Sequence, residues 1–409
     1  MQKRLLYLLL FIPTAFFAGG FQVNLQGQKQ AGMGHTGTGL LLDQACIFFN
    51  PGALVHLDTV YGFYLGSSFI IPRTQYLEPA PGVYNAEPEH HIGTPFTIYA
   101  AYKVRSKDNM YLGLGVYTPF GSRVQWPDDW KGKFLIREID LKTVFIQPTF
   151  SYKVNDKLGI GAGPIFATGG FLLRKALPVQ DSTGQYGEGT LEGKAMGFGF
   201  NAGIYYKLNE KFSLGLDYRS QVKVTVRNGD ATFTVPPSLE QYFPATHFTS
   251  AIKLPQTISA GLGYKVNKRL TLALDVNYVG WHCYDSLKID FADTTSKLQN
   301  IHSARMYKNV FIYRVGGQYK INDLIIARLG AYFDSSPVNA GYLTPETPDQ
   351  NKIGITSGVT FAISNRANVD VSLLYIEGLK RTDTNLETQF SGTWKTRAVV
   401  PGVSFELLW

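Results

Sequence analysis

The histidines are the residues of this 409-residue chain whose side chains could support catalysis or bind a metal. No two of them have the spacing of metal ligands, and the adjacent pair His90-His91 lies in a predicted solvated loop. A Ser-His arrangement needs a third residue that orients the imidazole, and neither His302-Ser303 nor His282 with Ser286 has a clear one. We therefore expect no enzyme, no bound metal and no cofactor. The seven histidines are His35, His56, His90, His91, His247, His282 and His302.

The sequence supports ligand binding better than catalysis, because residues 228–254 are unusually apolar for a connection between regular elements. Three prolines limit the length of any helix in this segment. We expect an external surface there that captures a hydrophobic ligand, and a loop that only folds onto its neighbours is the alternative. The candidate capture residues are Phe233, Leu239, Tyr242, Phe243 and Phe248, with Val235 and Ile252 in the same segment.

Six copies of a short motif indicate the elements that must hold these residues. Each copy starts with an aromatic residue between two alternating apolar runs, and most contain an Asn beside a charged residue. Asn and Asp tolerate left-handed backbone and bond within their own turn, so the motif predicts tight hairpins. A repeat this long suits two membrane-crossing strands with a generous loop at the far end. The copies start at Tyr102, Tyr152, Tyr206, Tyr264, Tyr319 and Phe361, at intervals of 50, 54, 58, 55 and 42 residues.

Period-two alternation over about ten residues favours strands that cross a membrane. Soluble sandwich strands alternate in the same way but are usually about half as long. The chain is therefore predicted to be all-β, a 14-stranded antiparallel transmembrane β-barrel over residues 58–409 with lipid outside and a polar lumen. The expected strands cover about 60–71, 93–105, 109–120, 138–154, 157–173, 191–208, 211–227, 254–266, 269–284, 308–320, 323–334, 351–363, 366–380 and 396–409.

Both ends of the chain carry export signals. Residues 1–20 have the pattern of a cleaved signal peptide: two basic residues, 13 mostly apolar residues, then Ala18-Gly19-Gly20. Cleavage after Ala18 or after Gly20 fits this pattern. The last strand alternates and stops on Trp409, which resembles the C-terminal insertion signal of bacterial outer-membrane proteins and implies recognition by the barrel assembly machinery. We expect an integral protein of the bacterial outer membrane.

Residues 21–57 do not alternate and are rich in glycine. Such a segment forms no stable strand or helix alone, yet it is too apolar for a solvated tail. We expect it to fold inside the barrel as a hatch that plugs the lumen, and a flexible leader is the alternative.

The net charge, the two cysteines and two carboxylates give further expectations about partners and cross-links. The net charge of +8 includes no basic run, so nucleic acid is not an expected partner. Cys46 and Cys283 either pair in an oxidising periplasm or stay unpaired. The lumenal carboxylates Asp217 and Asp275 are expected to pack the lumen, with ion pairs to Arg219 or Arg269.

Several of these stretches resemble one family, the FadL/TodX (OMPP1) outer-membrane transporters of long-chain fatty acids and other hydrophobic compounds. The resemblance rests on Gly20-Phe21-Gln22-Val23-Asn24, the glycine-rich stretch, Asp43-Gln44-Ala45, Asn50-Pro51, Tyr117-Thr118-Pro119-Phe120-Gly121, residues 128–133 and residues 140–143. Two departures leave the ligand open. The family's Asn-Pro-Ala is Asn50-Pro51-Gly52 here, and the loop expected at about 174–190 is shorter than in fatty-acid members.

The resemblance implies that a monomer captures a hydrophobic molecule outside, holds it in the lumen and releases it sideways as the hatch moves. Phe21, Asn50, Pro51 and Gly52 would then lie at the ligand. Thr118, Pro119, Phe120 and Gly121 would form a lateral gate, because Pro119 lacks a backbone donor and Gly121 weakens the strand. Pro119 as the plain top of the strand is the alternative. The other expected partners are outer-membrane lipid and lipopolysaccharide. A general diffusion porin and an adhesin-like barrel stay open as alternative functions.

Overall fold

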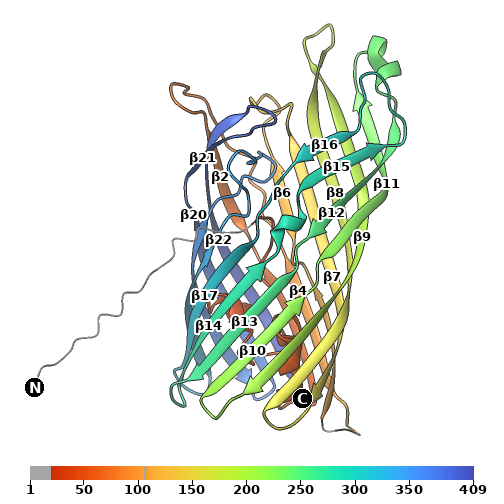
Figure 1. The fold of residues 1–409 in the computed structure, drawn as a ribbon. Helices are drawn as coiled ribbons and strands as arrows, with labels where there is room; N and C mark the ends of the chain where they lie inside the picture. Colours follow the sequence, from red (N-terminus) through yellow and green to blue (C-terminus); the bar gives the residue numbers. More distant parts are fainter. Residues whose placement is uncertain (1–19, 106, 108) are drawn as a thin grey trace, which may run out of the picture.

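Antiparallel strands close on themselves into a barrel (Figure 1). The computed structural model describes residues 20–409 except residues 106 and 108. The wall has 14 strands in chain order, and the first pairs with the last, with Gly62 opposite Leu408. The predicted all-β, 14-stranded antiparallel barrel is confirmed. The predicted signal peptide lies outside the described residues, apart from Gly20.

Some wall strands are continuous and others are interrupted, so that one wall strand can consist of two segments. The first seven wall strands are β1 (Tyr61–Ser68) with β2 (Ile71–Leu77), β4 (Phe96–Lys103), β5 (Met110–Tyr117) with β6 (Gly121–Gln125), β7 (Glu138–Lys153), β8 (Leu158–Gln180), β9 (Tyr186–Lys207), and β10 (Phe212–Arg219) with β11 (Val222–Thr234). The short strand β3 (Asn85–Ala86) pairs with β2. The remaining seven are β12 (Thr246–Leu254) with β13 (Thr257–Lys265), β14 (Leu270–Val279) with β15 (Ser286–Phe291), β16 (Ile301–Ala304) with β17 (Val310–Lys320), β18 (Ile325–Asp334), β19 (Lys352–Ser364), β20 (Ala367–Gly378) with β21 (Arg381–Thr384), and β22 (Ser391–Leu408).

The repeated Asn residues shape the short turns at one end of the barrel. In four of the turns the side-chain Oδ1 accepts hydrogen bonds from the backbone N–H groups two and three residues later, at 2.8–2.9 Å. This pattern satisfies the donors of a tight turn and explains why the motif recurs once per strand pair. These four residues are Asn155, Asn209, Asn267 and Asn322.

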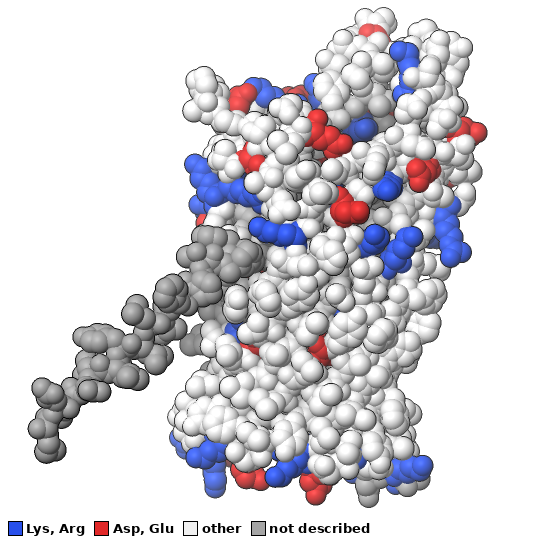
Figure 2. All heavy atoms as spheres, viewed as in Figure 1, with Lys and Arg blue, Asp and Glu red and all other residues white. Residues whose placement is uncertain are grey.

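An apolar belt surrounds the barrel between the short turns and the long loops. Figure 2 shows this belt almost free of charged side chains, with Lys, Arg, Asp and Glu gathered at its two edges. On β9, for example, the outward residues Met196 and Phe198 are 68% and 70% exposed, whereas the inward Asn201 and Tyr205 are buried. Exposed large apolar side chains are tolerated over such an area only where lipid covers them.

Residues 20–57 run inside the barrel; most of them are buried and none is exposed. They form only three short helices, α1 (Gln28–Ala31), α2 (Cys46–Phe49) and the 3₁₀ helix η1 (Pro51–His56). α1 packs against β19, β20 and β22, and η1 packs against β7, β8 and β9, so the N-terminal segment contacts the wall at separate places around the lumen. Cys46 and Cys283 are both buried free thiols.

The structure corrects the bounds of two predicted connections and one predicted strand. β8 and β9 extend far beyond the belt, so the predicted loop at 174–190 shrinks to residues 181–185. The segment 228–254 is mostly strand as well, and only residues 235–245 connect β11 to β12. The strand expected at 269–284 stops at Val279, where the 3₁₀ helix η3 (Trp281–Cys283) interrupts the wall.

Candidate functional site

The third wall strand is interrupted where the N-terminal segment touches it. β5 ends at Tyr117 and β6 begins at Gly121. β5 pairs with β4 on one side and β7 on the other, whereas β6 pairs with β7 alone. The backbone groups in between bond instead to the N-terminal segment: Val23 N donates to Pro119 O at 2.8 Å, and Gly121 N donates to Phe21 O at 3.1 Å.

The second wall strand separates from the third at the same height. The last regular pair between them is Thr97 with Tyr117. Just beyond it, Thr118 Oγ1 donates to Phe96 O at 3.4 Å. Further out the two edges meet again at Gln125, whose carbonyl accepts from Glu89 N at 2.7 Å and whose side chain lies 2.9 Å from His91 Nε2. Between these two levels the edges face one another without a ladder, across residues 89–96 and 118–124. We call this opening the wall window, and residues 87–95 along its edge the strap.

The strap is fastened to the first wall strand. Ile70 and Gly93 exchange two backbone hydrogen bonds, at 2.7 and 3.0 Å, in an isolated antiparallel bridge. A Cβ atom placed on Gly93 would lie 3.5 Å from the Cβ of Ile70. Pro95 O also accepts from Ser68 N at 3.1 Å. The strap is therefore held by a few separate bonds along its length, fewer than a continuous ladder would supply.

A cavity of about 810 Å³ reaches from the lumen to the wall window. Strap residues, Thr118 and residues 120–124 line its outer part, and Phe21, Val23 and Leu25 of the N-terminal segment line its inner part. The polar groups that face it include Lys352, which forms a 2.8 Å ion pair with Asp349. The volume is in the usual range for small-molecule sites, roughly 300–1,000 Å³.

Phe21 sits in a cluster of aromatic rings. Its ring centroid lies 4.9 Å from that of Trp281, 5.8 Å from Tyr284 and 6.1 Å from Phe120, all in edge-to-face geometry. The sequence reasoning singled out Phe21 and Phe120 but missed Trp281 and Tyr284. The loss of alternation at 280–284 was the signal that could have pointed to them.

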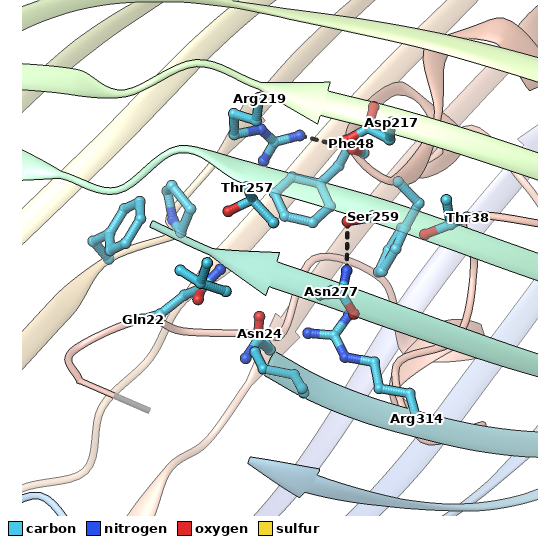
Figure 3. A pocket seen from close by; sticks show the side chains of 15 residues that line it. Gln22, Asn24, Thr38, Phe48, Asp217, Arg219, Thr257, Ser259, Asn277 and Arg314 are labelled. Carbon is cyan, nitrogen blue, oxygen red and sulfur yellow. Dashed lines mark hydrogen bonds between the residues drawn. The ribbon is translucent and has the colours of Figure 1, made fainter. Parts of the chain in front are cut away.

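A second, small cavity of about 30 Å³ lies deeper in the lumen, where there is room for roughly one water molecule. Figure 3 shows Phe48 between Arg219 and the polar side chains of the neighbouring strands. The Arg219 guanidinium stacks on the Phe48 ring at 3.9 Å and donates to Phe48 O at 2.7 Å. Asp217 accepts from Asn201 Nδ2 at 2.8 Å, in place of the predicted ion pair with an arginine.

Buried polar contacts fasten the rest of the N-terminal segment to the wall. Asp275 Oδ2 accepts from the backbone N–H groups of Gly37 and Thr38, both at 2.9 Å, rather than pairing with Arg269. Lys29 Nζ lies 2.5 Å from Glu406 and 3.7 Å from Asp43. Burying several charges together is favourable only when each has a partner, so these contacts define one seated position for the segment.

Asn50, Pro51 and Gly52 belong to this fastening and line neither of the two cavities described. Asn50 Nδ2 donates to Thr38 O and to Ile204 O, each at 2.9 Å, and its Oδ1 accepts from Gly52 N. A Cβ on Gly52 would lie 2.7 Å from Gly203 O. These three residues therefore seat the segment against β8 and β9, away from Phe21 and the wall window.

The candidate capture residues divide into two groups. Leu239 and Tyr242 lie in the 3₁₀ helix η2 (Pro237–Tyr242) beyond the end of β11, and Phe243 follows it with its ring 5.9 Å from Phe233. Phe248 instead lies on the inward face of β12, 1% exposed, with its ring 6.2 Å from Phe171. Phe248 therefore cannot belong to an external surface, because the strand that carries it begins earlier than the sequence pattern indicated.

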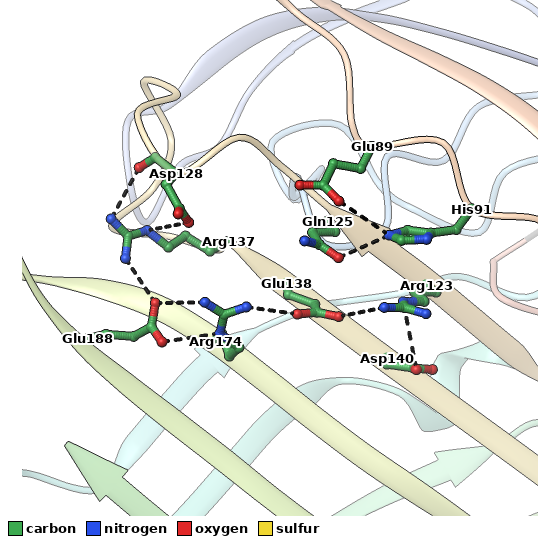
Figure 4. Close-up of polar contacts among 10 residues, drawn as sticks. All are labelled: Glu89, His91, Arg123, Gln125, Asp128, Arg137, Glu138, Asp140, Arg174 and Glu188. Carbon is green, nitrogen blue, oxygen red and sulfur yellow. Dashed lines mark hydrogen bonds and ion pairs between the residues drawn. The ribbon is translucent and has the colours of Figure 1, made fainter. Parts of the chain in front are cut away.

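The outer rim of the wall window carries a network of ion pairs (Figure 4). Arg174 bonds to Glu138 at 3.1 Å and to Glu188 at 3.0 Å, while Arg123 contacts Glu138 at 3.2 Å on the other side. Arg137 continues the chain through Glu188 at 2.9 Å. Opposite charges alternate along the network, so this part of the surface is close to neutral.

The chain matches a family model described as "Outer membrane protein transport protein (OMPP1/FadL/TodX)" over residues 9–407. The chain belongs to this family. The family comprises outer-membrane transport proteins, not enzymes, and membership with the barrel fold makes this chain an integral protein of the outer membrane.

Curated relatives match along most of their length. The chain is 24% identical over 392 residues to the long-chain fatty acid transport protein of Salmonella typhi, covering 90% of this chain and 89% of the relative. It is 25% identical over 419 residues to a putative outer membrane protein of Neisseria meningitidis serogroup B, covering 90% and 87%.

Solved structures share the fold. A Pseudomonas aeruginosa FadL homologue superposes with a TM-score of 0.83 at 17% identity, covering 95% of this chain and 99% of that chain. The P. putida toluene transporter TodX gives 0.72 at 16% identity, covering 97% and 99%.

Proposed function

We propose that this protein takes up hydrophobic small molecules, long-chain fatty acids or aromatic hydrocarbons, across the outer membrane. A ligand is captured on the apolar surface around η2, binds in the larger cavity and leaves sideways through the wall window into the bilayer. The observation that carries the proposal is that a single cavity is lined on one side by the N-terminal segment and on the other by the wall window, where strand pairing stops. The names of the relatives, which include fatty-acid and toluene transporters, agree with a hydrophobic ligand.

Lateral release avoids the step that would oppose transport. Each CH₂ group moved from an apolar site into water costs about 0.8 kcal/mol, so an alkyl chain that left through a wet periplasmic mouth would meet a large barrier. Unpaired backbone is tolerated at membrane depth only where protein or a water-filled cavity covers it. Here the backbone of Pro119 and Gly121 bonds to residues 21–23, so the same contact closes the window and satisfies the broken strand.

In this proposal residues 21–57 act as a hatch. Phe21 and Val23 hold the gate by two backbone hydrogen bonds, while the rest of the segment is fastened to distant strands. The tip can therefore move while the body stays seated. A general diffusion porin would need an open lumen instead, and its single-channel conductance would be high. We expect the purified protein in planar bilayers to conduct ions poorly.

A disulfide between the strap and the first wall strand tests whether lateral release requires the strap to move. In the Ile70→Cys/Gly93→Cys variant the two Cβ atoms would lie about 3.5 Å apart, a separation that suits a disulfide. Oxidation should stop fatty-acid or toluene uptake in cells while leaving ligand binding measurable on the purified protein, and reduction should restore uptake. Val371→Cys/Val403→Cys is the matched control, because these opposed residues join β20 to β22 in the regular wall. Normal uptake by the oxidised Ile70–Gly93 variant would show that release does not require the strap to separate from the first wall strand.

A further inference from the structure

The outward face of β9 to β15 carries cations that the transport proposal does not use. Figure 2 shows Lys and Arg side chains gathered on this side at the upper edge of the apolar belt. All five are exposed, and they come from four neighbouring strand segments. We call them the basic band. Its members are Lys194 on β9, Lys223 and Arg227 on β11, Lys253 on β12 and Lys288 on β15.

The band has a fixed place in the order of side chains along each strand. On β9 the exposed apolar residues Phe198 and Met196 are followed, going outward, by Lys194 and then by exposed Glu192. On the strand formed by β10 and β11 the order is Leu216, Lys223, Arg227, Asp230, and on that formed by β14 and β15 it is Leu274, Asp285, Lys288, Asp290. Cations therefore border the belt on all three strands. Glu192, Asp230 and Asp290 lie one step further from the membrane, whereas Asp285 lies at the level of the band.

Two members of the band face each other, and none of the five has a carboxylate partner among the described ion pairs. Lys223 lies directly opposite Lys253 across the β11–β12 ladder, an arrangement that destabilises a sheet unless an anion separates the charges. None of the five has a carboxylate within 4.0 Å among the described ion pairs, although Asp285 acts on Lys253 from further away. The ion-pair network of Figure 4 is the contrast, because its arginines are all matched by carboxylates.

We propose that the basic band binds the phosphate groups of lipopolysaccharide in the outer leaflet. A phosphorylated, multiply acylated sugar places anions next to the hydrocarbon layer, so its acyl chains cover Met196 and Phe198 while its phosphates reach the cations above them. Charge-assisted bonds from ammonium and guanidinium groups to phosphate are the strong kind, and juxtaposed lysines suit a dianion. The outer carboxylates face the sugar region, where divalent cations bridge anions.

Native mass spectrometry in a mild detergent tests this with bisphosphorylated lipid A as the probe. The Lys223→Gln/Lys253→Gln/Lys288→Gln variant should bind the lipid about tenfold more weakly than the parent, since each such charge contributes up to roughly fivefold near an anionic surface. The control Lys157→Gln/Lys211→Gln/Lys268→Gln removes the same charge from exposed residues in the short turns and should bind like the parent. Heat-modifiable migration in gels verifies that both variants are folded barrels.

Two further arms identify the phosphate's source. Dephosphorylated lipid A should bind the parent protein about as weakly as the phosphorylated lipid binds the band variant. Inorganic phosphate at the same concentration should not displace the lipid, because it has no acyl chains to cover the belt. Equal binding by parent and band variant, an equal loss in the turn variant, or displacement by inorganic phosphate would each overturn the proposal.

Discussion

Replacing Asp275 by alanine should release the middle of the N-terminal segment while the barrel stays intact. The carboxylate of Asp275 accepts both the Gly37 and the Thr38 N–H groups at 2.9 Å inside the lumen. Removing the acceptor leaves two buried N–H groups without a partner, which costs about 1–3 kcal/mol each. The alanine variant no longer has to bury a carboxylate, and this gain in stability offsets part of the loss.

We expect a net destabilisation of the seated segment of about 2 kcal/mol, which corresponds to roughly a thirtyfold larger population of the released state. Hydrogen–deuterium exchange of peptides covering residues 34–42 measures this population. Protection there should fall by about that factor, while protection of the wall strands should not change. Asp275→Asn keeps a neutral acceptor in place and should show a smaller effect.

Asp217→Asn is the matched control for this experiment. Asp217 is a buried lumenal carboxylate as well, but the bond described for it is to Asn201 of the wall rather than to the N-terminal segment. The reasoning is wrong if residues 34–42 exchange at the parental rate in Asp275→Ala, or if Asp217→Asn exposes them equally.

Two further predictions concern the ends of the transport path and the seat of η1. The Phe233→Ser/Tyr242→Ser/Phe243→Ser variant should assemble normally but take up ligand more slowly, since an apolar contact with one such ring contributes about 1.5–3 kcal/mol. Val83→Ser, which changes another exposed apolar loop residue, is the control. Unchanged uptake kinetics in the triple variant would mean that the η2 region is only a lid. Burial, together with the charges of Lys207 and Lys153, lowers the pKa of His56 from its usual 6.5 to about 4. The seated state therefore holds the neutral imidazole, and its stability is full above pH 6.5 and falls as the pH drops toward 4. Exchange of residues 51–57, corrected for the intrinsic rate, should accelerate from pH 7 to pH 5 in the parent, and the same acceleration in His56→Gln would contradict this assignment.

The wall could be predicted from the sequence because lipid imposes a strict rule on it. Alternation of apolar and small residues, as on β9, follows from one face in hydrocarbon and one in the lumen, and the Asn turns separate the strands. Where β8 and β9 leave the belt the rule ends, and Arg174 and Glu188 form an ion pair where a loop was expected. The apolar signal therefore underestimates strand length outside the membrane.

The site was predictable in part for a different reason. Pro119 and Gly121 predict a break in the strand because of their backbone properties, and the strand is interrupted between Tyr117 and Gly121. The partners of Phe21 were not predictable, because Trp281 is 260 positions away in the chain and only the path of the N-terminal segment brings them together. That path is determined by close approaches between backbones and by buried polar contacts, and neither leaves a periodic pattern in the sequence.

Those approaches limit how the protein can change by mutation. A Cβ on Gly39 would lie 2.5 Å from the carbonyl carbon of Gly261, and a Cβ on Gly261 would lie 2.3 Å from Gly39 N. Gly52 and Gly159 exclude each other's side chains in the same reciprocal way, at 2.8 and 2.2 Å. Both members of each pair are already the smallest residue, so no second substitution can compensate for the first. The seat of the N-terminal segment is therefore closed to gradual redesign, and under the proposed function new cargo preferences must arise among the residues that line the larger cavity.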